Sequence, residues 1–221
     1  MIDFKISKEV KEVCTNMALG LLKADVEVKS SSDSLIKEID DLCASIVEKL
    51  AIEELTADLR IKNGREAYKA LGKSPSKYRL SSEALIRRVL QGKGLYRVNN
   101  IVDINNLISI KSKFPVGSYD LTYVNYPVVL NKAKEGDVYR GIGKDTLNIE
   151  NLPVLSDSEG PFGSPTSDSV RAMIKGTSKE IVLCIYSFSG RNNLEIYLNY
   201  AKELLEKYAQ GKNFEISVVF E

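Results

Sequence analysis

The spacing of apolar residues changes character once along this chain, near Phe114. Between about residues 33 and 112, apolar side chains recur at intervals of three and four positions, as they do on one face of a helix. After Phe114 they gather in short runs of strand length, separated by turn-forming residues. The spacing therefore predicts a helical block in the middle of the chain and a sheet-rich region after it.

The two ends of the chain complete this prediction. DFKIS and NMALGLLKADVEV, near the start, alternate as strands do. Near the other end, the apolar EIVLCIYSF precedes a helical stripe from Leu194 to Tyr208 and then the alternating FEISVVF, which suggests a crossover unit. We expect an α+β protein with mixed, largely antiparallel sheets, a central helical block and a C-terminal strand–helix–strand unit.

Length and charge bound the class of protein. With 221 residues, 43% of them hydrophobic, the chain can bury a sizeable core, and we expect residues 1–221 to form one domain with two closely packed sub-parts. Because 31 basic and 30 acidic side chains nearly cancel, no global positive field is available for DNA, and any RNA contact must be local. No apolar run approaches the ~20 residues of a membrane span, so we expect a soluble cytoplasmic protein. The oligomeric state stays open.

The absence of histidine removes many mechanisms at once. It excludes Ser-His and Cys-His nucleophiles, an imidazole base and histidine-bearing zinc sites. The three cysteines, Cys14, Cys43 and Cys184, lie far apart without CxxC spacing, which indicates reduced thiols. Carboxylates, hydroxyls and backbone N–H groups remain for any catalysis, and the sequence calls for no metal or cofactor.

Several motifs have both a functional and a structural interpretation. GIGKD lacks the remainder of a phosphate-binding loop and is more typical of a hairpin. Cys184, inside an apolar strand, is typical of a buried hydrophobic residue. Basic side chains after residue 86 could follow an RNA backbone or form a solvated helix face; the candidates for RNA binding are Arg87, Arg88, Lys93 and Arg97.

The stretch GPFGSPTSDS, residues 160–169, precedes one of the most apolar segments and is predicted to be a loop, neither helix nor strand. Gly160 and Gly163 permit a close approach of backbone, and the short polar side chains offer donors and acceptors. The stretch can therefore hold an ester. Alternatively, it is a rigid connection whose hydroxyl groups bind its own backbone.

Residues 81–121, SSEALIRRVLQGKGLYRVNNIVDINNLISIKSKFPVGSYDL, resemble the opening of the tRNA-editing module of the phenylalanyl-tRNA synthetase β subunit, which is built from the third and fourth domains of that subunit. The matching elements are a serine at a helix start, an Asn-Asn block, a Pro-to-Asp-Leu turn and a glycine-containing loop. In this chain they correspond to Ser82, residues 99–105, residues 115–121 and Phe162-Gly163. The resemblance is dense over residues 75–188 and looser outside, and the motifs for aminoacylation are missing.

The resemblance implies a cleft between two sheet-bearing halves, in which a wrongly attached amino acid is hydrolysed from a tRNA. In the family this amino acid is commonly tyrosine attached to a phenylalanine tRNA. Two departures put that tyrosine specificity in doubt for this chain. Gly117 stands where the family commonly has a histidine, and Cys184 aligns near the glutamate that recognises a substrate hydroxyl. The substrate-binding residues that the resemblance implies are Ser82, Asn99, Asp103, Asn105, Pro115, Gly117, Tyr119, Gly163 and Cys184. Asn99 and Asp103 are equally well placed to cap a helix.

Two function classes follow. The first is a trans-acting aminoacyl-tRNA hydrolase that binds the aminoacylated 3′ end of a tRNA. Its loop would use backbone amides and the hydroxyls of Ser164, Thr166 and Ser167, with Asp168 orienting groups or water. The second is a module that binds tRNA or an amino-acid-like ligand without catalysis. Hydrolysis of a small free ester or amide is a third possibility. The sequence specifies neither the amino acid nor the tRNA.

Overall fold

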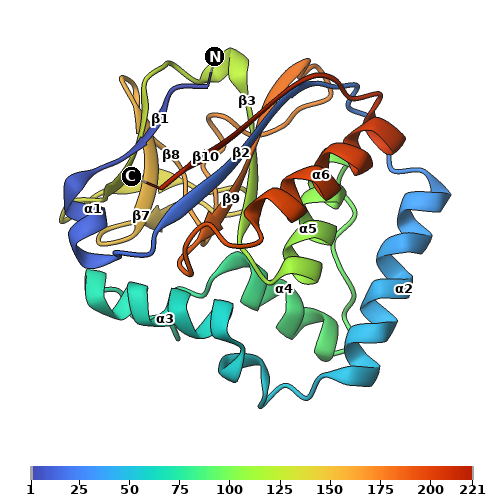
Figure 1. The fold of residues 1–221 in the computed structure, drawn as a ribbon, viewed down its shortest axis with the longest axis horizontal. Coiled ribbons are helices and arrows are strands. Elements are labelled where there is room, and N and C mark those ends of the chain that lie inside the picture. Colours follow the sequence, from blue (N-terminus) through green and yellow to red (C-terminus); the bar gives the residue numbers. More distant parts are fainter. Residues whose placement is uncertain (1, 221) are drawn as a thin grey trace.

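The computed structural model describes residues 2–220 and has an α+β architecture, which confirms the predicted fold class. Two four-stranded sheets lie toward one side of the molecule, and the longer helices gather on the other (Figure 1). The helices are α1 (Lys8–Val13), α2 (Asp33–Lys49), α3 (Leu59–Leu71), α4 (Ser81–Leu90), α5 (Asn100–Ser112) and α6 (Leu194–Ala209). The strands are β1 (Phe4–Ile6), β2 (Ala18–Asp25), β3 (Val116–Asp120), β4 (Val128–Lys132), β5 (Val138–Arg140), β6 (Thr146–Asn148), β7 (Pro153–Asp157), β8 (Gly160–Gly163), β9 (Glu180–Ser187) and β10 (Lys212–Val219).

Local sequence signals set the bounds of the helices. The Ser32 hydroxyl accepts from the backbone N–H of Leu35 at the start of α2, and α3 ends at Gly72, whose φ of 92° is left-handed. At the start of α5, the Asn99 side chain accepts from the N–H of Val102 at 3.0 Å. Asn99 is therefore a capping residue, as its structural interpretation predicts. Among residues 2–220, no helix is long and apolar enough to span a membrane.

The larger core sheet has the strand order β10-β2-β9-β3, with every neighbouring pair antiparallel. Strand β9 is buried almost throughout, because it lies between two other strands and both of its faces are covered. Strands β9 and β10 are parallel with β2 between them, so the predicted C-terminal strand–helix–strand unit is a crossover. A glycine, Gly20 on β2, lets the Leu198 side chain of α6 approach this sheet closely.

The second sheet has the order β1-β4-β7-β8, in which only the β1–β4 pair is parallel. A separate hairpin of β5 and β6 contains the glycines of GIGKD, as the sequence predicts. The two sheets meet where Tyr119 of β3 packs edge-on against Phe162 of β8, with ring centroids 5.1 Å apart. All three cysteines are free thiols.

One prediction for the segment 160–169 is wrong. Residues 160–163 form strand β8, which pairs with β7 at the edge of its sheet. An edge strand tolerates Pro161, which has no N–H to donate, and the segment becomes irregular only from Ser164 onward. The expected loop is therefore shorter than the sequence suggests.

Candidate functional site

The turn after β8 is closed by its own hydroxyl groups. The Ser164 hydroxyl donates to the carbonyl of Ser167 at 2.8 Å and accepts from the N–H groups of Thr166 and Ser167 at 3.3 and 3.1 Å. The N–H of Ser164 itself donates to Asp168 Oδ1 at 3.0 Å. Three backbone amides that could have stabilised an oxyanion therefore already have acceptors, and the Ser164 hydroxyl holds the turn together.

Four buried tyrosines from different elements converge on this turn. Tyr119 of β3 donates to Asp168 Oδ1 at 2.8 Å and shares a 2.6 Å hydrogen bond with the hydroxyl of Tyr186 on β9. Tyr139 of β5 donates to the Ser164 hydroxyl at 3.2 Å and to the carbonyl of Ser167. Tyr68 of α3 pairs with the Thr166 hydroxyl at 2.8 Å. The turn is thus fixed by phenol groups rather than by ion pairs.

Asp168 is a carboxylate in a neutral environment. Burial raises its pKa to about 6, and the hydrogen bonds from Ser164 and Tyr119 offset only part of that effect. Within residues 2–220, no lysine or arginine contributes to this shift. A carboxyl group with a pKa near neutrality can exchange protons at physiological pH, which makes Asp168 the strongest candidate for acid–base chemistry in this region.

Two glycines bound the phenol of Tyr119. A Cβ atom on Gly117 would lie 2.9 Å from Tyr119 Cζ and 3.1 Å from Asp168 Oδ2, and one on Gly163 would lie 2.5 Å from Tyr119 Cζ. The ring of Tyr119 therefore fills the space between these two glycines. Cys184 faces Gly117 across the β3–β9 pair, and burial raises the pKa of its thiol, which is chemically quiet. Pro115 is buried and accepts from the N–H of Tyr186.

Ser82 lies next to the turn. The N–H of Ser81 donates to the carbonyl of Pro165 at 2.7 Å, which joins the start of α4 to the segment 160–169. Ser82 is fully buried, yet its hydroxyl has no hydrogen-bond partner within residues 2–220. A buried polar atom without a partner is rare in native proteins and requires an explanation.

The other polar candidates use their side chains elsewhere. Asp103 accepts from the Ser31 hydroxyl at 2.6 Å and from the N–H of Val98 at 3.1 Å. Asn105 accepts from the Ser118 hydroxyl at 2.8 Å. Because side chains alternate along β3, Asn105 lies on the opposite face of the sheet from Gly117 and Tyr119. The structure therefore gives Asn99, Asp103 and Asn105 structural contacts and does not bring them to the turn.

Part of the predicted basic patch lines a groove beside α4. Its volume is about 320 Å³, and its lining residues are Arg79, Ala84, Leu85, Arg87, Arg88, Gln91, Lys93 and Tyr96. The guanidinium of Arg88 stacks over the Tyr96 ring at 4.0 Å, and Tyr96 is 57% exposed. Arg87 is also paired with the buried Glu83, whereas Arg97 pairs with Asp40 and is not among the lining residues.

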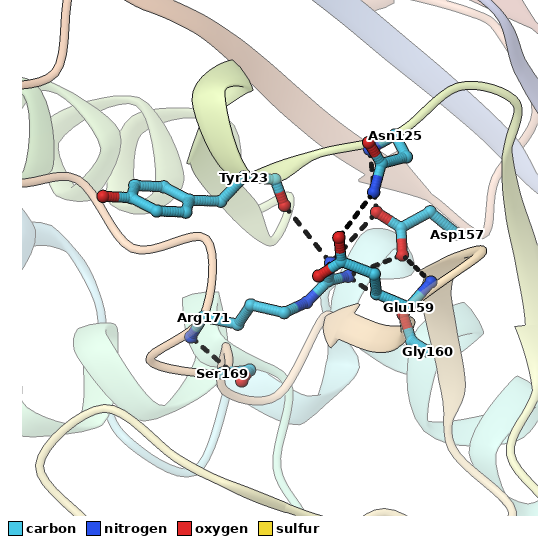
Figure 2. A network of polar contacts seen from close by, with 7 residues as sticks. All are labelled: Tyr123, Asn125, Asp157, Glu159, Gly160, Ser169 and Arg171. Carbon is cyan, nitrogen blue, oxygen red and sulfur yellow. Dashed lines mark hydrogen bonds and ion pairs between the residues drawn. The ribbon is translucent and has the colours of Figure 1, made fainter.

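A second polar network, which the sequence gives no sign of, holds the outer end of the same segment (Figure 2). The Arg171 guanidinium donates to both oxygens of Asp157, at 2.9 and 3.1 Å, and to the carbonyl of Gly160. Asp157 also accepts from the N–H groups of Asn125 and Glu159, each at 2.9 Å. Arg171 lies over the ring of Phe162, so this network packs directly against β8.

Comparison with known proteins places the chain among synthetase-related modules. The family model of the B3/4 domain matches residues 63–215. The phenylalanine–tRNA ligase β subunit of Aquifex aeolicus is 27% identical over 104 residues, 46% of this chain, and that of Protochlamydia amoebophila is 29% identical over 79 residues, 35% of this chain. These matches span only 13% and 10% of the two relatives. An N-terminal fragment of the phenylalanyl-tRNA synthetase β subunit from Pyrococcus horikoshii aligns with 99% of this chain and 50% of its own, at a TM-score of 0.48 and 10% identity.

Proposed function

From the premise that this chain belongs to the B3/4 domain family, we propose that it binds the aminoacylated 3′ end of a tRNA along helix α4. The observation that carries the proposal is that one helix joins two suitable features. The unpartnered hydroxyl of Ser82 is buried at its start, beside the 160–169 segment, and the basic groove lies along its length and beyond its end. The similarity to ligase subunits that act on tRNA supports the choice of ligand.

The groove has the chemistry that single-stranded RNA requires. Arginine and lysine side chains attract phosphates. The Tyr96 ring, which is 57% exposed although Arg88 lies over it, offers a surface on which a base can stack. At the other end of α4, an amino-acid ester would supply the hydrogen-bond partner that the Ser82 hydroxyl lacks. We also propose that residues 1–221 act as one domain, since both ends of the chain contribute strands to the core sheet.

Hydrolysis of the ester is a second candidate function, and Asp168 favours it. With a pKa of about 6, this carboxylate is largely ionised at neutral pH and could accept a proton from an attacking water. The hydroxyls of Ser164 and Thr166 are less suitable, because they already bind the turn and Tyr68. A hydrolytic reaction would therefore rest on Asp168 rather than on the hydroxyls of Ser164 and Thr166.

Binding is tested by titrating the protein with a panel of uncharged, correctly charged and mischarged tRNAs at several salt concentrations. We expect Arg79→Ala and Lys93→Ala to weaken binding to all tRNAs and to reduce the salt slope by roughly 1 for each phosphate that is no longer neutralised. Lys8→Ala, on the exposed face of α1, is the matched control. Binding that the groove variants leave unchanged would refute the groove as the RNA site.

The variant Ser82→Ala tests whether the buried Ser82 hydroxyl binds the aminoacyl group or is only an unpartnered atom in the core. Removal of a buried hydroxyl without a partner should leave the protein as stable as before or more stable. If the hydroxyl binds the aminoacyl group, the same variant should no longer prefer charged over uncharged tRNA. Ester hydrolysis, the second candidate function, is tested by measuring the loss of aminoacyl ester in the same samples. We expect the unaltered protein to hydrolyse the ester and Asp168→Asn to do so much more slowly.

A further inference from the structure

The ring of Tyr119 lies in a space that two glycines keep open. Side chains at both Gly117 and Gly163 would overlap the phenol of Tyr119, so each position requires glycine while the ring is there. Neither glycine has a left-handed φ, so backbone conformation does not explain them. We call the space bounded by Gly117, Gly163 and Phe162, together with its polar end at Asp168 and Tyr186, the Tyr119 site.

The Tyr119 site has the features of a binding site for a phenol. Phe162 packs edge-on against the ring at an interplanar angle of 81°, a favourable geometry for two aromatic rings. At the polar end, Asp168 Oδ1 accepts a hydrogen bond from the Tyr119 hydroxyl at 2.8 Å, and the Tyr186 hydroxyl lies 2.6 Å from the Tyr119 hydroxyl oxygen. A charged acceptor gives a stronger hydrogen bond than a neutral one, so the site favours a hydroxyl at the far end of a ring.

We propose that Tyr119 acts as an internal ligand: its phenol occupies a site that fits a para-substituted phenol, and it keeps ligands with large side chains out. The effect on aminoacyl ligands rests on the proposed function, whereas the phenol site does not. Tyr119 would thus be the residue that limits which amino acids can be accommodated beside the 160–169 segment. The two glycines and Phe162 would be the walls that it shares with any ligand that replaced it.

The test is to remove the ring and supply it from solution. In the full chain carrying Tyr119→Ala, we expect p-cresol, which reproduces the tyrosine side chain beyond Cα, to raise the thermal unfolding midpoint as its concentration increases. Toluene, which lacks the hydroxyl, should raise the midpoint less. Tyr119→Phe is the matched control, because it loses the hydroxyl but keeps the ring; neither it nor the unaltered protein should respond to p-cresol.

Two results would overturn the proposal. One is that p-cresol raises the midpoints of Tyr119→Ala and Tyr119→Phe equally, and the other is that it leaves the midpoint of Tyr119→Ala unchanged. If Tyr119→Ala does not fold alone, refolding in p-cresol but not in toluene is the expected result, and failure in both overturns the proposal. Because these assays contain no tRNA, they can fail while tRNA binding stands, and the reverse. In the tRNA panel, Tyr119→Ala should extend binding toward tRNAs carrying aromatic amino acids.

Discussion

Two buried carboxylates hold the two ends of one segment, and they do so in opposite ways. Asp157, at the outer end, meets the guanidinium of Arg171 and two backbone N–H groups. Burial alone would raise its pKa, but these partners outweigh burial and hold the pKa below its usual value. Asp168, at the inner end, meets one N–H and the hydroxyl of Tyr119, and burial raises its pKa.

The difference in the partners of these two carboxylates distinguishes a structural ion pair from a candidate functional site. A carboxylate whose charge is compensated by arginine stabilises the fold where it is ionised, and it has little chemistry left to offer. A carboxylate surrounded by phenols destabilises the folded state when it ionises, a cost that proteins commonly keep at functional sites. The outer network therefore holds β8 in place, and the inner network is where we expect a ligand to act.

Breaking the outer network should have the largest effect. Arg171→Met keeps a long apolar side chain over Phe162 but leaves the fully buried Asp157 carboxylate without its cation. We expect a loss of about 3–5 kcal/mol in the free energy of unfolding, measured in urea. Arg140→Ala, which removes an exposed arginine from β5, should have an effect close to zero. Equal losses from both variants would mean that the network does not contribute to the stability of the fold.

The pH dependence of stability should distinguish the two carboxylates by sign. Because the folded pKa of Asp168 is about 6, against 3.8 when exposed, this group contributes stability that is fully present below pH 3.8 and is lost as pH rises through 6. The difference corresponds to about 3 kcal/mol at most. Asp168→Asn should remove that decline and be more stable than the unaltered protein at pH 7.

Asp157→Asn should behave in the opposite way. The lowered pKa of Asp157 contributes stability that is present above the usual pKa of an aspartate and is lost as pH falls through the lowered value. The neighbouring tyrosines and Cys184 have raised pKa values and do not titrate in this acid range. Other carboxyls with shifted pKa values, Glu38 and Glu215 among them, also titrate in this range, so each carboxylate is read from the difference between its variant and the unaltered protein from pH 3 to pH 8. Parallel difference profiles for the two variants would contradict the comparison.

A smaller loss of stability is expected from breaking the hydrogen bond between the uncharged side chains of Tyr68 and Thr166. Thr166→Val leaves the buried hydroxyl of Tyr68 without its partner and should cost about 1–2 kcal/mol of unfolding free energy. The change does not alter charge, so the pH profile should keep its shape. A shift in the pH at which stability declines would show that Thr166 acts through Asp168 after all.

The smallest effect is expected at Ser167. Its side chain is partly exposed, and its contacts with the turn run through the backbone carbonyl and N–H. Ser167→Ala should change the free energy of unfolding by less than about 0.5 kcal/mol. If the same variant abolishes ester hydrolysis by a protein that otherwise shows it, Ser167 belongs to the reaction and not to the scaffold.

Local signals explain what the sequence could predict. Ser32 and Asn99 cap helices through atoms only three residues away, so their roles follow from short-range patterns. Strand β8 escaped prediction because Pro161 and two glycines are poor strand formers, and only its place at a sheet edge makes them acceptable. The similarity to a known module directed attention to Ser82, but nothing in the sequence shows that its hydroxyl lacks a partner.

The tyrosine cluster could not be predicted for a related reason. Tyr68, Tyr119, Tyr139 and Tyr186 belong to four elements. The resemblance points to Tyr119 alone, and the other three look in sequence like ordinary core residues. The hydroxyl groups of the four tyrosines meet only because strands β3 and β9 pair and because the turn after β8 folds beneath them. Partnerships of this kind depend on register between distant segments, and a single residue slip would redirect the side chains to the other face of the sheet.

The position of β2 between β9 and β10 also shapes how the chain must fold. Both hydrogen-bonding neighbours of β2 are synthesised after most of the chain, so no local hairpin can form it early. Pairings so distant in sequence are slow to form, because the loop entropy is lost before the contacts are gained. Until Glu180 and the residues after it have left the ribosome, the apolar β2 carries two open edges that invite pairing with other chains. Arrival of the last strand, rather than collapse of the helices, should therefore end the period in which a new molecule is prone to aggregate.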